Sequence, residues 1–532
     1  MRKIAVALMI NGFTQFAMAA VINIPADYPT IQQGIDASLD GDTVLVQPGT
    51  YVENINFNGH NIVLGSLFLT TGDESYISTT IIDGDSSGAV IALSNFENSS
   101  TVITGFTIMN GGGVDGGGII CDGTGPVITR NFIMGNFGQN GGGIFCVGAD
   151  PIISDNYISG NTSSGIGCHR SRPKIIGNEF IGNFADLGGA IYCESSPEAI
   201  ISENYISRNF GISDGAGIYC YLSDATIIGN TIFENIAGRG GGIFCRQSSP
   251  SIKGNTISSN LGDMNGGGLF LYQSDPVTAN NIIEGNLAGA YGGGLFFNHS
   301  DGDFFNNTVT KNMATLGGGG TYNFYSVPTI TNSIFWANNA PSWPEIFNYS
   351  GASAITYSDI QGGWTGEGNI DIDPLFRDPG NDDYHLRYTP CGDTLDSPCI
   401  DVGSPAIIDS LLDCAWGLGT ISSDMGAYGG GKLEMLGVGD NPSSLPDEYM
   451  IKNYPNPFNQ VTLIEFDLMH DCYVTIDIID IMGRITAELV DGYRPVGRNF
   501  AAWDASNHAS GIYFCRLEAC EFKEVRRIVL IR

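Results

Sequence analysis

An internal repeat with a nearly constant period constrains the fold of this chain more than any other feature of its sequence. Asparagines recur along the chain, each at the start of a similar short segment, and their sequence positions advance in turn by 25, 22, 26, 26, 25, 26, 26 and 25. They are Asn131, Asn156, Asn178, Asn204, Asn230, Asn255, Asn281, Asn307 and Asn332. A second row of asparagines follows five positions later, beginning at Asn136. Rows that share one period indicate a single structural unit repeated along the chain.

A further row and the composition of each unit point to β-strands. Cysteines follow clusters of glycine and are continued by two apolar residues: Cys121, Cys146, Cys168, Cys193, Cys220, Cys245, Leu271 and Phe297. In a typical unit, residues 250–273, short alternating segments are separated by turns rich in glycine, asparagine and aspartate. We predict three short strands per unit, stacked as the coils of a parallel β-helix. At a strand spacing of ~4.8 Å, nine coils would form a rod of about 43 Å.

Stacking gives each row a physical meaning. Inward asparagines of successive coils can hydrogen-bond along the axis of the rod, and the cysteines form an inward apolar stack. Glycine triplets such as 266–268 bend the chain where a positive φ or close packing is required. A phosphate-binding glycine loop would occur once, before a helix, and the calcium-binding β-roll has a period of about nine residues. The period therefore disfavours both kinds of site.

The composition excludes several classes of protein. The chain has 532 residues with 56 acidic and 23 basic side chains, hence a net charge of −33, and 42% of its residues are hydrophobic. A disordered acidic tail would have less apolar content, and collagen needs glycine at every third position. Because so negative a protein repels polyanions, we expect no nucleic-acid partner.

Three segments near the start complete the pattern. They read Ile-Pro-Ala-Asp-Tyr-Pro-Thr-Ile-Gln at 24–32, Gly-Asp-Thr-Val at 41–44 and Pro-Gly-Thr-Tyr at 48–51. Together with the repeats, they resemble the right-handed parallel β-helix, or pectin-lyase-like, superfamily over residues 21–340. The resemblance implies an all-β solenoid whose open end is covered by a short amphipathic helix over 30–39. Ile31, Ile35 and Leu39 have the spacing that such a helix requires.

Residues 1–20 have the pattern of a secretory signal peptide. A basic pair, Arg2 and Lys3, precedes an apolar stretch, and the small residues Ala17 and Ala19 suit a cleavage site. No later segment contains the ~18 consecutive apolar residues of a membrane helix. We therefore expect an exported protein without a transmembrane span.

An acidic region follows the repeats. We expect residues 341–439 to form an irregular cap on the far end of the rod, and 440–452 to be a linker. Between 359 and 413 there are 12 acidic and 2 basic residues. Aspartate is common in turns, but its carboxylates are also ligands that Ca²⁺ prefers. Calcium is therefore one alternative and no cofactor the other, with the candidate ligands Asp371, Asp373, Asp378, Asp382 and Asp383.

Residues 453–532 form a separate module of short strands, predicted to be a small Ig-like β-sandwich. It begins with Asn-Tyr-Pro-Asn-Pro-Phe-Asn at 453–459 and later contains Trp503-Asp504 and Gly-Ile-Tyr-Phe at 511–514. This order of motifs resembles the C-terminal sorting domain of type IX secretion, which overlaps with FlgD-like immunoglobulin-type domains. The resemblance implies contact with the outer-membrane secretion machinery, and release or surface attachment in a Gram-negative-type bacterium.

Twelve cysteines in an exported protein raise the question of disulfides. Those in the stacked row are ~4.8 Å apart, longer than the ~3.8 Å between Cβ atoms that a disulfide prefers, so we expect free thiols there. Cys391, Cys399 and Cys414 can provide one bridge, and Cys515 with Cys520 a second. Cys472 is left unassigned. Because paired C-x-x-C motifs are absent, we expect no metal site of cysteines.

Two groups of side chains are candidates for function because stacking brings equivalent positions of successive coils together. His169, Arg170, Arg172 and Lys174 form a basic spot, with Glu194 one coil above. The catalytic candidates are Arg246, Asp275, His299, Asp301 and Asp303. Two stacked carboxylates lie ~4.8 Å apart, and a retaining glycosidase needs ~5–5.5 Å. A polysaccharide lyase would instead use acids for Ca²⁺ and a basic side chain as the base.

The favoured function is nevertheless binding. Aspartate is common at the turns of any β-helix, and the chain lacks the carboxylate triplet of polygalacturonases and the Tyr-Gly-Phe-Asp-Pro-His string of alginate epimerases. We predict a non-catalytic surface or secreted protein that binds an extracellular polysaccharide, a surface glycan or matrix. The binding candidates are Tyr221, Tyr272, Phe324 and Tyr325. The alternative is a polysaccharide lyase or glycoside hydrolase that acts in a groove on the rod.

Overall fold

The computed structural model describes residues 19–430, except 114, 410, 411 and 413, and residues 450–530 with short gaps. The gaps are 455–460, 469–471, 481–483, 495–496, 506–507 and 520–521. The chain divides into two compact units, residues 1–435 and 436–532. Nearly all of the expected signal peptide, most of the expected linker and Cys520 lie outside the described residues.

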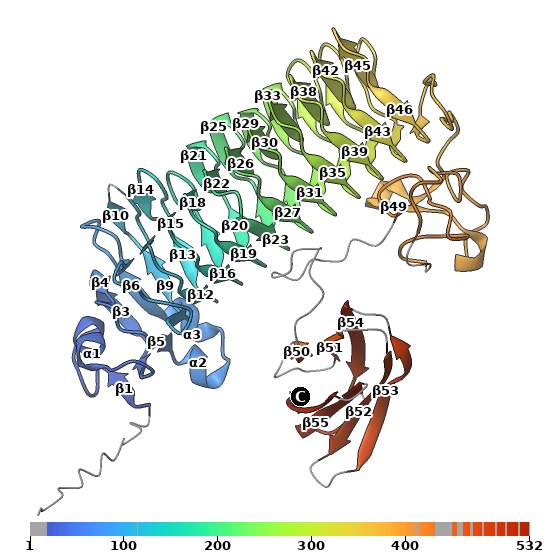
Figure 1. Ribbon diagram of the computed structural model, residues 1–532. Coiled ribbons are helices and arrows are strands. Elements are labelled where there is room, and N and C mark those ends of the chain that lie inside the picture. Colours follow the sequence, from blue (N-terminus) through green and yellow to red (C-terminus); the bar gives the residue numbers. More distant parts are fainter. Residues whose placement is uncertain are drawn as a thin grey trace, which may run out of the picture. The chain divides into compact units, whose positions relative to one another are not determined.

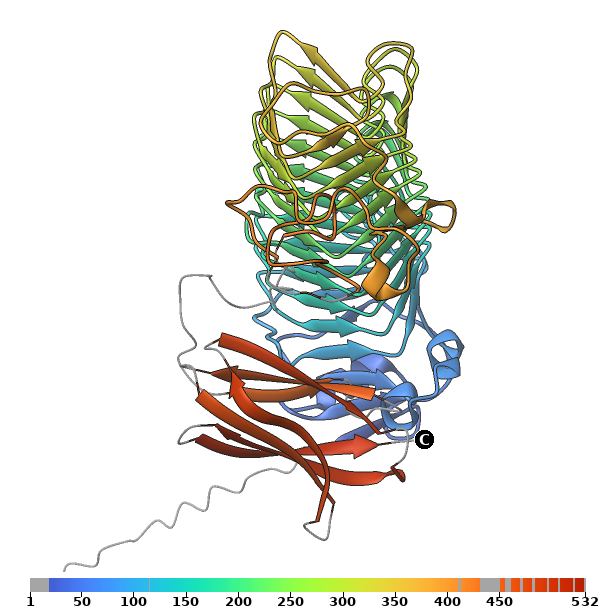
Figure 2. The ribbon, with the colours of Figure 1, turned by 90° about the vertical axis from the view of Figure 1, so that its right-hand side faces the viewer.

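The predicted stack of parallel strands is confirmed in the first unit, where it forms three long sheets along one axis (Figures 1 and 2). Sheet A has 14 strands, from β1 (Val21–Ile24) to β46 (Ala354–Thr356). Sheet B has 13, ending at β47 (Asp359–Ile360), and sheet C has 12, ending at β45 (Ile346–Tyr349). The stack thus exceeds the nine predicted coils, because the coils at both ends keep the alternation of apolar residues but lose the asparagines.

One coil, residues 250–273, shows the path of the chain. β31 (Ser251–Lys253) lies in sheet A, β32 (Thr256–Ser258) in sheet B and β34 (Leu269–Tyr272) in sheet C. Between the last two, β33 (Leu261–Asn265) pairs with its neighbours in a six-stranded sheet D. We call this part of each coil the arm. The prediction of three strands missed it because the arm segment, Leu-Gly-Asp-Met-Asn, does not alternate.

A glycine triplet, Gly266–Gly268, returns the chain from the arm to sheet C. Gly266 has a φ of +63°, which glycine adopts without strain. A Cβ on Gly267 would lie 2.5 Å from the carbonyl oxygen of Leu287 and 2.6 Å from that of Gly293 in the next coil. The triplet is therefore required both for its backbone conformation and for close packing between coils.

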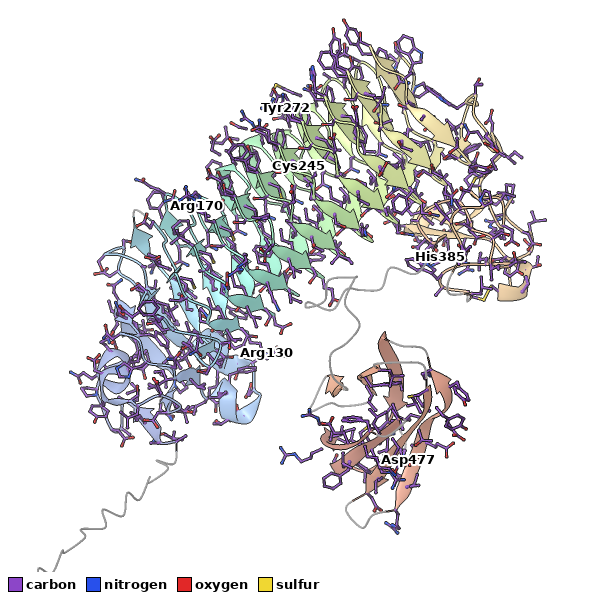
Figure 3. All side chains as sticks on the ribbon, in the orientation of Figure 1. Arg130, Arg170, Cys245, Tyr272, His385 and Asp477 are labelled. Atoms are coloured by element: carbon purple, nitrogen blue, oxygen red, sulfur yellow. A yellow bond between two sulfur atoms is a disulfide. The ribbon has the colours of Figure 1, made fainter. Side chains whose placement is uncertain are left out.

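Inward side chains stack in register and form the core. In sheet A, Ile227 pairs with Ile252, and both are fully buried. In sheet C, successive cysteines pair strand by strand, and all six are fully buried free thiols, among them Cys245, labelled within the coils in Figure 3. The row continues with Leu271 and Phe297.

The asparagine rows form hydrogen-bonded ladders. The Nδ2 atom of Asn230 donates to Oδ1 of Asn255 at 2.9 Å and to the carbonyl oxygen of Ile201 at 2.9 Å. The backbone N–H of Asn230 donates to the same Oδ1 at 2.9 Å. Asn332, which follows the repeat in sequence, is not part of the ladder: Ser333 takes the next position and accepts from the backbone of Asn307.

The predicted N-terminal helix is α1 (Ile31–Ala37), with Thr30 as its N-cap. Ile31 and Ile35 are fully buried, as expected of residues that cover the first coil. Leu39 is not: it lies beyond the helix and is 65% exposed, because the chain leaves the helix at the Ser38 C-cap before another turn can form. Two more short helices follow, α2 (Phe68–Thr71) and α3 (Ser75–Thr79).

A long irregular segment, residues 376–430, which we call the far-end segment, packs on the outside of sheet B near the far end (orange in Figure 1). Its Tyr384 is buried with Ile334 of β44 (Ile334–Trp336). The only regular elements described in it are β48 (Phe376–Asp378), β49 (Asp383–Leu386) and two 3₁₀ turns, Pro379–Asn381 and Thr389–Cys391. Of the three predicted alternatives for a bridge, Cys391–Cys414 is formed, and Cys399 is a buried free thiol.

The second unit contains two antiparallel sheets around a shared core. One sheet holds β50 (Met450–Tyr454), β51 (Val461–Leu468) and β54 (Gly497–Asp504). The other holds β52 (Cys472–Asp480), β53 (Ile485–Arg494), β55 (Gly511–Ala519) and β56 (Phe522–Leu530). The core includes Trp503 and Ile476, which are 1% and 0% exposed.

The predicted Cys515–Cys520 bridge is wrong. Cys515 is a free thiol buried in this core, and its cross-strand neighbour is Arg526. In the described part of the chain, none of the helices has the length and apolar character needed to cross a bilayer.

Candidate functional site

One row of side chains lines the edge at which the strands of sheet C end. Residues at the last position of each strand pair in register from coil to coil. We call them the edge row: Tyr221, Arg246, Tyr272, Asn298, Phe324 and Tyr349. They end β26 (Ile218–Tyr221), β30 (Ile243–Arg246), β34, β38 (Leu295–Asn298), β42 (Thr321–Phe324) and β45.

A sharp turn makes both the edge row and the following residue point outward. The residue after the strand has a positive φ in each coil, +49° at Gln273 and +52° at His299. The next residue is an inward serine: Ser274 Oγ donates to the carbonyl of Tyr272 and accepts from the backbone of Ser248. This repeated turn presents two neighbouring side chains per coil, and Tyr272 is seen at the edge in Figure 3.

A cation lies between two aromatic rings in the middle of the edge. The guanidinium carbon of Arg246 is 5.5 Å from the ring centre of Tyr221 and 5.8 Å from that of Tyr272. These distances are those of cation–π contacts. Arg246 is exposed and both tyrosines are half-buried, packed against the aromatic side chains on the outer side of sheet C while part of each remains accessible.

A second aromatic group lies farther along the edge. His299 stacks on Tyr325 with ring centres 5.3 Å apart, and Phe324 stacks on Tyr349 at 5.3 Å. Phe324 and Tyr325 meet edge to face at 4.6 Å. The structure thus brings all four predicted binding residues to one edge, together with Tyr349, which the prediction did not include.

The candidate acids are not gathered into a cleft. Asp275 Oδ1 accepts the backbone N–H of Asp301 at 2.6 Å, and Asp301 Oδ1 accepts that of Val327 at 2.6 Å. Each carboxylate therefore ties its own turn to the next coil. Asp303 lies elsewhere, at the start of β39 (Asp303–Phe305) on sheet A. Arg246 and His299 are engaged with aromatic rings instead.

Two family models match the chain. One describes a right-handed beta helix region and matches residues 89–248 and 174–335. The other describes a secretion system C-terminal sorting domain and matches residues 452–531. The protein is a right-handed β-helix with a C-terminal sorting domain. None of the curated proteins matches it.

The sorting domain also defines where the β-helix acts. Such a domain is delivered by the type IX secretion machinery, so the β-helix protein is secreted or lies on the surface of a Gram-negative-type bacterium. The two matches confirm the predicted right-handed β-helix, the sorting domain and the localisation. The substrate or partner of the β-helix must be sought in its own side chains.

The predicted basic spot of the β-helix is largely neutralised. Arg172 pairs with Asp150 at 2.9 Å and approaches Glu198 at 3.8 Å. His169 Nδ1 lies 3.5 Å from Glu194 Oε2. Arg170 is exposed and has a positive φ, and Lys174 belongs to β19 (Lys174–Ile176) of sheet A. Arg170 appears on the same side of the coils as Tyr272 in Figure 3.

The calcium candidates serve local turns. Asp371 accepts the backbone N–H of Gly362, and Asp383 lies 2.6 Å from Nδ1 of His385. The others are likewise in turns: Asp373 accepts from Leu375, Asp378 from Asn381, and Asp382 has a φ of +61°. Across the described residues, no three or more His, Cys, Asp or Glu side chains are grouped to hold a metal ion.

A buried aromatic stack beneath the arms was not predicted. Its rings lie on the outer side of sheet C, with successive centres 4.7 to 5.5 Å apart. The buried rings belong to Tyr219, Phe244, Phe270, Phe296 and Tyr322, and the half-buried Tyr192 extends the stack at one end. The sequence contains the signal, because one of these rings directly precedes each member of the cysteine row from Cys193 onward. The stack supports the edge row from below.

Proposed function

We propose that this β-helix protein is a non-catalytic, exported carbohydrate-binding protein that holds a glycan chain along its edge row. The observation that carries this proposal is the line of accessible aromatic rings, with Arg246 between Tyr221 and Tyr272. Aromatic side chains offer an apolar face to a sugar ring, and their polar neighbours bond its hydroxyl groups. Gln247, Gln273, Asn298 and His299 supply such groups along the same edge.

Rigidity supports binding at the edge. Each ring of the edge row is anchored on a strand end and on its neighbours one coil away, so little conformational entropy is lost when a ligand binds. The length of the row suits an extended chain better than a single small molecule. Because Asp275 and Asp301 are committed to the backbone of the next coil, they contribute turn stability rather than an acid and base pair.

The proposal is tested by retention of the full-length protein on a panel of immobilised polysaccharides, with and without Ca²⁺. We expect retention without turnover, weakened about tenfold by Tyr272→Ala, since a stacked ring contributes on the order of 1 kcal/mol or more. Tyr205→Ala is the matched control, because Tyr205 is exposed on sheet B, away from the edge.

Two results would contradict binding without catalysis. Equal loss of retention in Tyr205→Ala and Tyr272→Ala would show that the edge is not the site. Reducing ends or unsaturated products that disappear in Asp301→Ala would show a glycosidase or a lyase, the alternative function.

A further inference from the structure

One coil of the β-helix is shorter than its neighbours. The step from Asn156 to Asn178 is 22 in sequence number, whereas the others are 25 or 26. The missing residues belong to the arm, where Thr162 makes only single bridges to the arms on either side. Those arms are β14 (Phe137–Gly138) and β21 (Phe184–Leu187). Sheet D is therefore interrupted at this coil.

The shortened arm leaves a cavity of about 420 Å³, which we call the notch. The arms that flank it are two coil spacings apart, about 9.6 Å. Gln139 and Asn140 line it from one arm, and Asp186 and Leu187 from the other. The remaining lining includes Phe145, Ser163, Ser164, His169, Tyr192 and Glu194.

Local sequence shapes the wall of the notch. Gly167 occupies the position at which the neighbouring coils carry Phe145 and Tyr192. A Cβ on Gly167 would lie 1.9 Å from the carbonyl oxygen of Asn140, so glycine is required for that arm to pack against the shortened coil, and Asn140 in turn lines the notch. The tight turn at 163–164 has φ values of +72° and +77° on two serines, a conformation that residues with a Cβ rarely adopt.

The notch combines an aromatic surface with hydrogen-bonding groups. Tyr192 stacks on Tyr219 with one face, at 5.5 Å, and it borders the notch as a half-buried residue. Its hydroxyl donates to Glu194 at 2.9 Å, and the same carboxylate lies 3.5 Å from His169. Asp186 adds a second carboxylate from β21, the arm of the same coil, where its Oδ1 also accepts from Ser213 Oγ at 2.6 Å. These groups are positioned before any ligand arrives.

Their chemistry selects an uncharged, hydroxylated ring. Carboxylates accept strong hydrogen bonds from hydroxyl groups, and two of them repel an anion. The aromatic face suits the apolar face of a pyranose. The volume lies within the range of small-molecule sites, roughly 300–1,000 Å³, and the width between the arms admits one ring rather than a chain.

We propose that the notch binds one neutral hexose residue, the end or a side branch of a glycan. The notch opens onto the edge, because His169 and Glu194 precede Tyr221 in the same register of sheet C strand ends. Only the attachment of this hexose to a longer glycan rests on the proposed function of the edge row. Binding of the hexose itself does not.

The test uses the full-length protein with methyl glucoside, galactoside and mannoside, and with glucuronate as the anionic probe, followed by saturation-transfer NMR and calorimetry. We expect one neutral glycoside to bind. Gln139→Trp, which places a bulky side chain at the mouth, should weaken it at least about tenfold, and Glu194→Gln by about threefold to tenfold. Leu316→Trp is the control, because Leu316 is 50% exposed on a distant arm.

Three outcomes would overturn the proposal: no binding of any neutral glycoside, preference for glucuronate, or binding that Gln139→Trp and Glu194→Gln leave unchanged. The proposed function of the edge row can be contradicted independently of the notch. If Tyr272→Ala leaves polysaccharide retention intact while Gln139→Trp abolishes glycoside binding, the edge is excluded and the notch stands. The reverse pattern excludes the notch alone.

Discussion

Buried polar side chains occur both inside the coils and in the far-end segment, but the two regions use different chemical groups. Inside the coils they are neutral amides: Asn255 accepts two hydrogen bonds from Asn230 and donates to the next coil. In and next to the far-end segment they are carboxyls. Asp359 and Asp424 are 0% and 1% exposed, and burial raises the pKa of each to about 7. An amide ladder is insensitive to pH, whereas buried carboxyls are not.

The difference follows from repetition. In a repeating coil, equivalent side chains lie one strand spacing apart. A side chain that carries both a donor and an acceptor, such as asparagine, can therefore donate to the equivalent side chain on one side and accept from the one on the other. The far-end segment has no repeat, and its loops use carboxylates that accept several backbone N–H groups at once. Asp424 accepts from Asp401 and Leu418 at 2.8 Å each. The amides of the middle coils do not titrate, whereas the last coils contain carboxyls that do: burial raises the pKa of Glu345, which accepts the backbone N–H of Asn338, to about 7.

The largest expected effect comes from breaking the ladder. Asn255→Ala removes the acceptor of two N–H groups of Asn230 and the donor to the carbonyl of Ile227. Leaving these groups buried without partners should cost about 2–6 kcal/mol of unfolding free energy. Urea unfolding measures it at pH 5 and pH 8, and the loss should be the same at both. Asn298→Ala, on the edge, is the control and should change stability by less than ~0.5 kcal/mol.

The next effect is the pH dependence of the far-end segment. Asp359 has a folded pKa of about 7, above the ~3.9 of an unfolded chain. Because the pKa is higher in the folded state, the protonated carboxyl of Asp359 adds to the free energy of unfolding. This contribution is complete below about pH 4 and is lost as pH rises to about 7. The loss is on the order of 4 kcal/mol. Hydrogen exchange should show residues 376–430 opening more readily at pH 8 than at pH 5, while sheet A near Ile252 stays protected.

Asp359→Asn provides the check on that assignment. It should reduce the pH dependence of the segment without abolishing it, because an amide has no charge to bury while Asp424, with its pKa raised to about 7, still titrates. An unchanged profile in this variant would place the titration elsewhere.

The smallest expected effect is a shift in the midpoint of the pH transition, which can be compared between variants of two buried cysteines. Cys399 donates its thiol to Asp359 at 3.3 Å, which holds the pKa of that carboxyl lower than burial alone would. Cys399→Ala should therefore move the midpoint of the pH transition upward by less than about one unit. Cys220→Ala, within the coils, should lower unfolding free energy by about 1–2 kcal/mol through a small cavity and leave the midpoint unchanged. Equal midpoint shifts in both variants would contradict the comparison.

Much of the fold could be predicted because equivalent residues in successive coils make the same contact, so the period of the repeat predicts which residues meet. The period placed Cys220 against Cys245 and Tyr272 one coil above Arg246, and the structure pairs them so. The arms escaped prediction because β33 does not alternate, and Asn332 was misplaced because the ladder changes to serine at the far end. The notch was visible as the short step between Asn156 and Asn178, but its meaning depends on which part of the coil is shortened.

The sequence by itself determined the strands, the stacking, the edge that carries the aromatic residues and the export domain, because each follows from local pattern or from repetition. The tertiary structure alone decided how the side chains are used. It engaged Asp275 and Asp301 with the backbone of the next coil, enclosed the aromatic stack beneath the arms and left the notch where one arm is shortened. These outcomes depend on the direction of side chains and on packing between segments far apart in the chain, which a one-dimensional period does not contain.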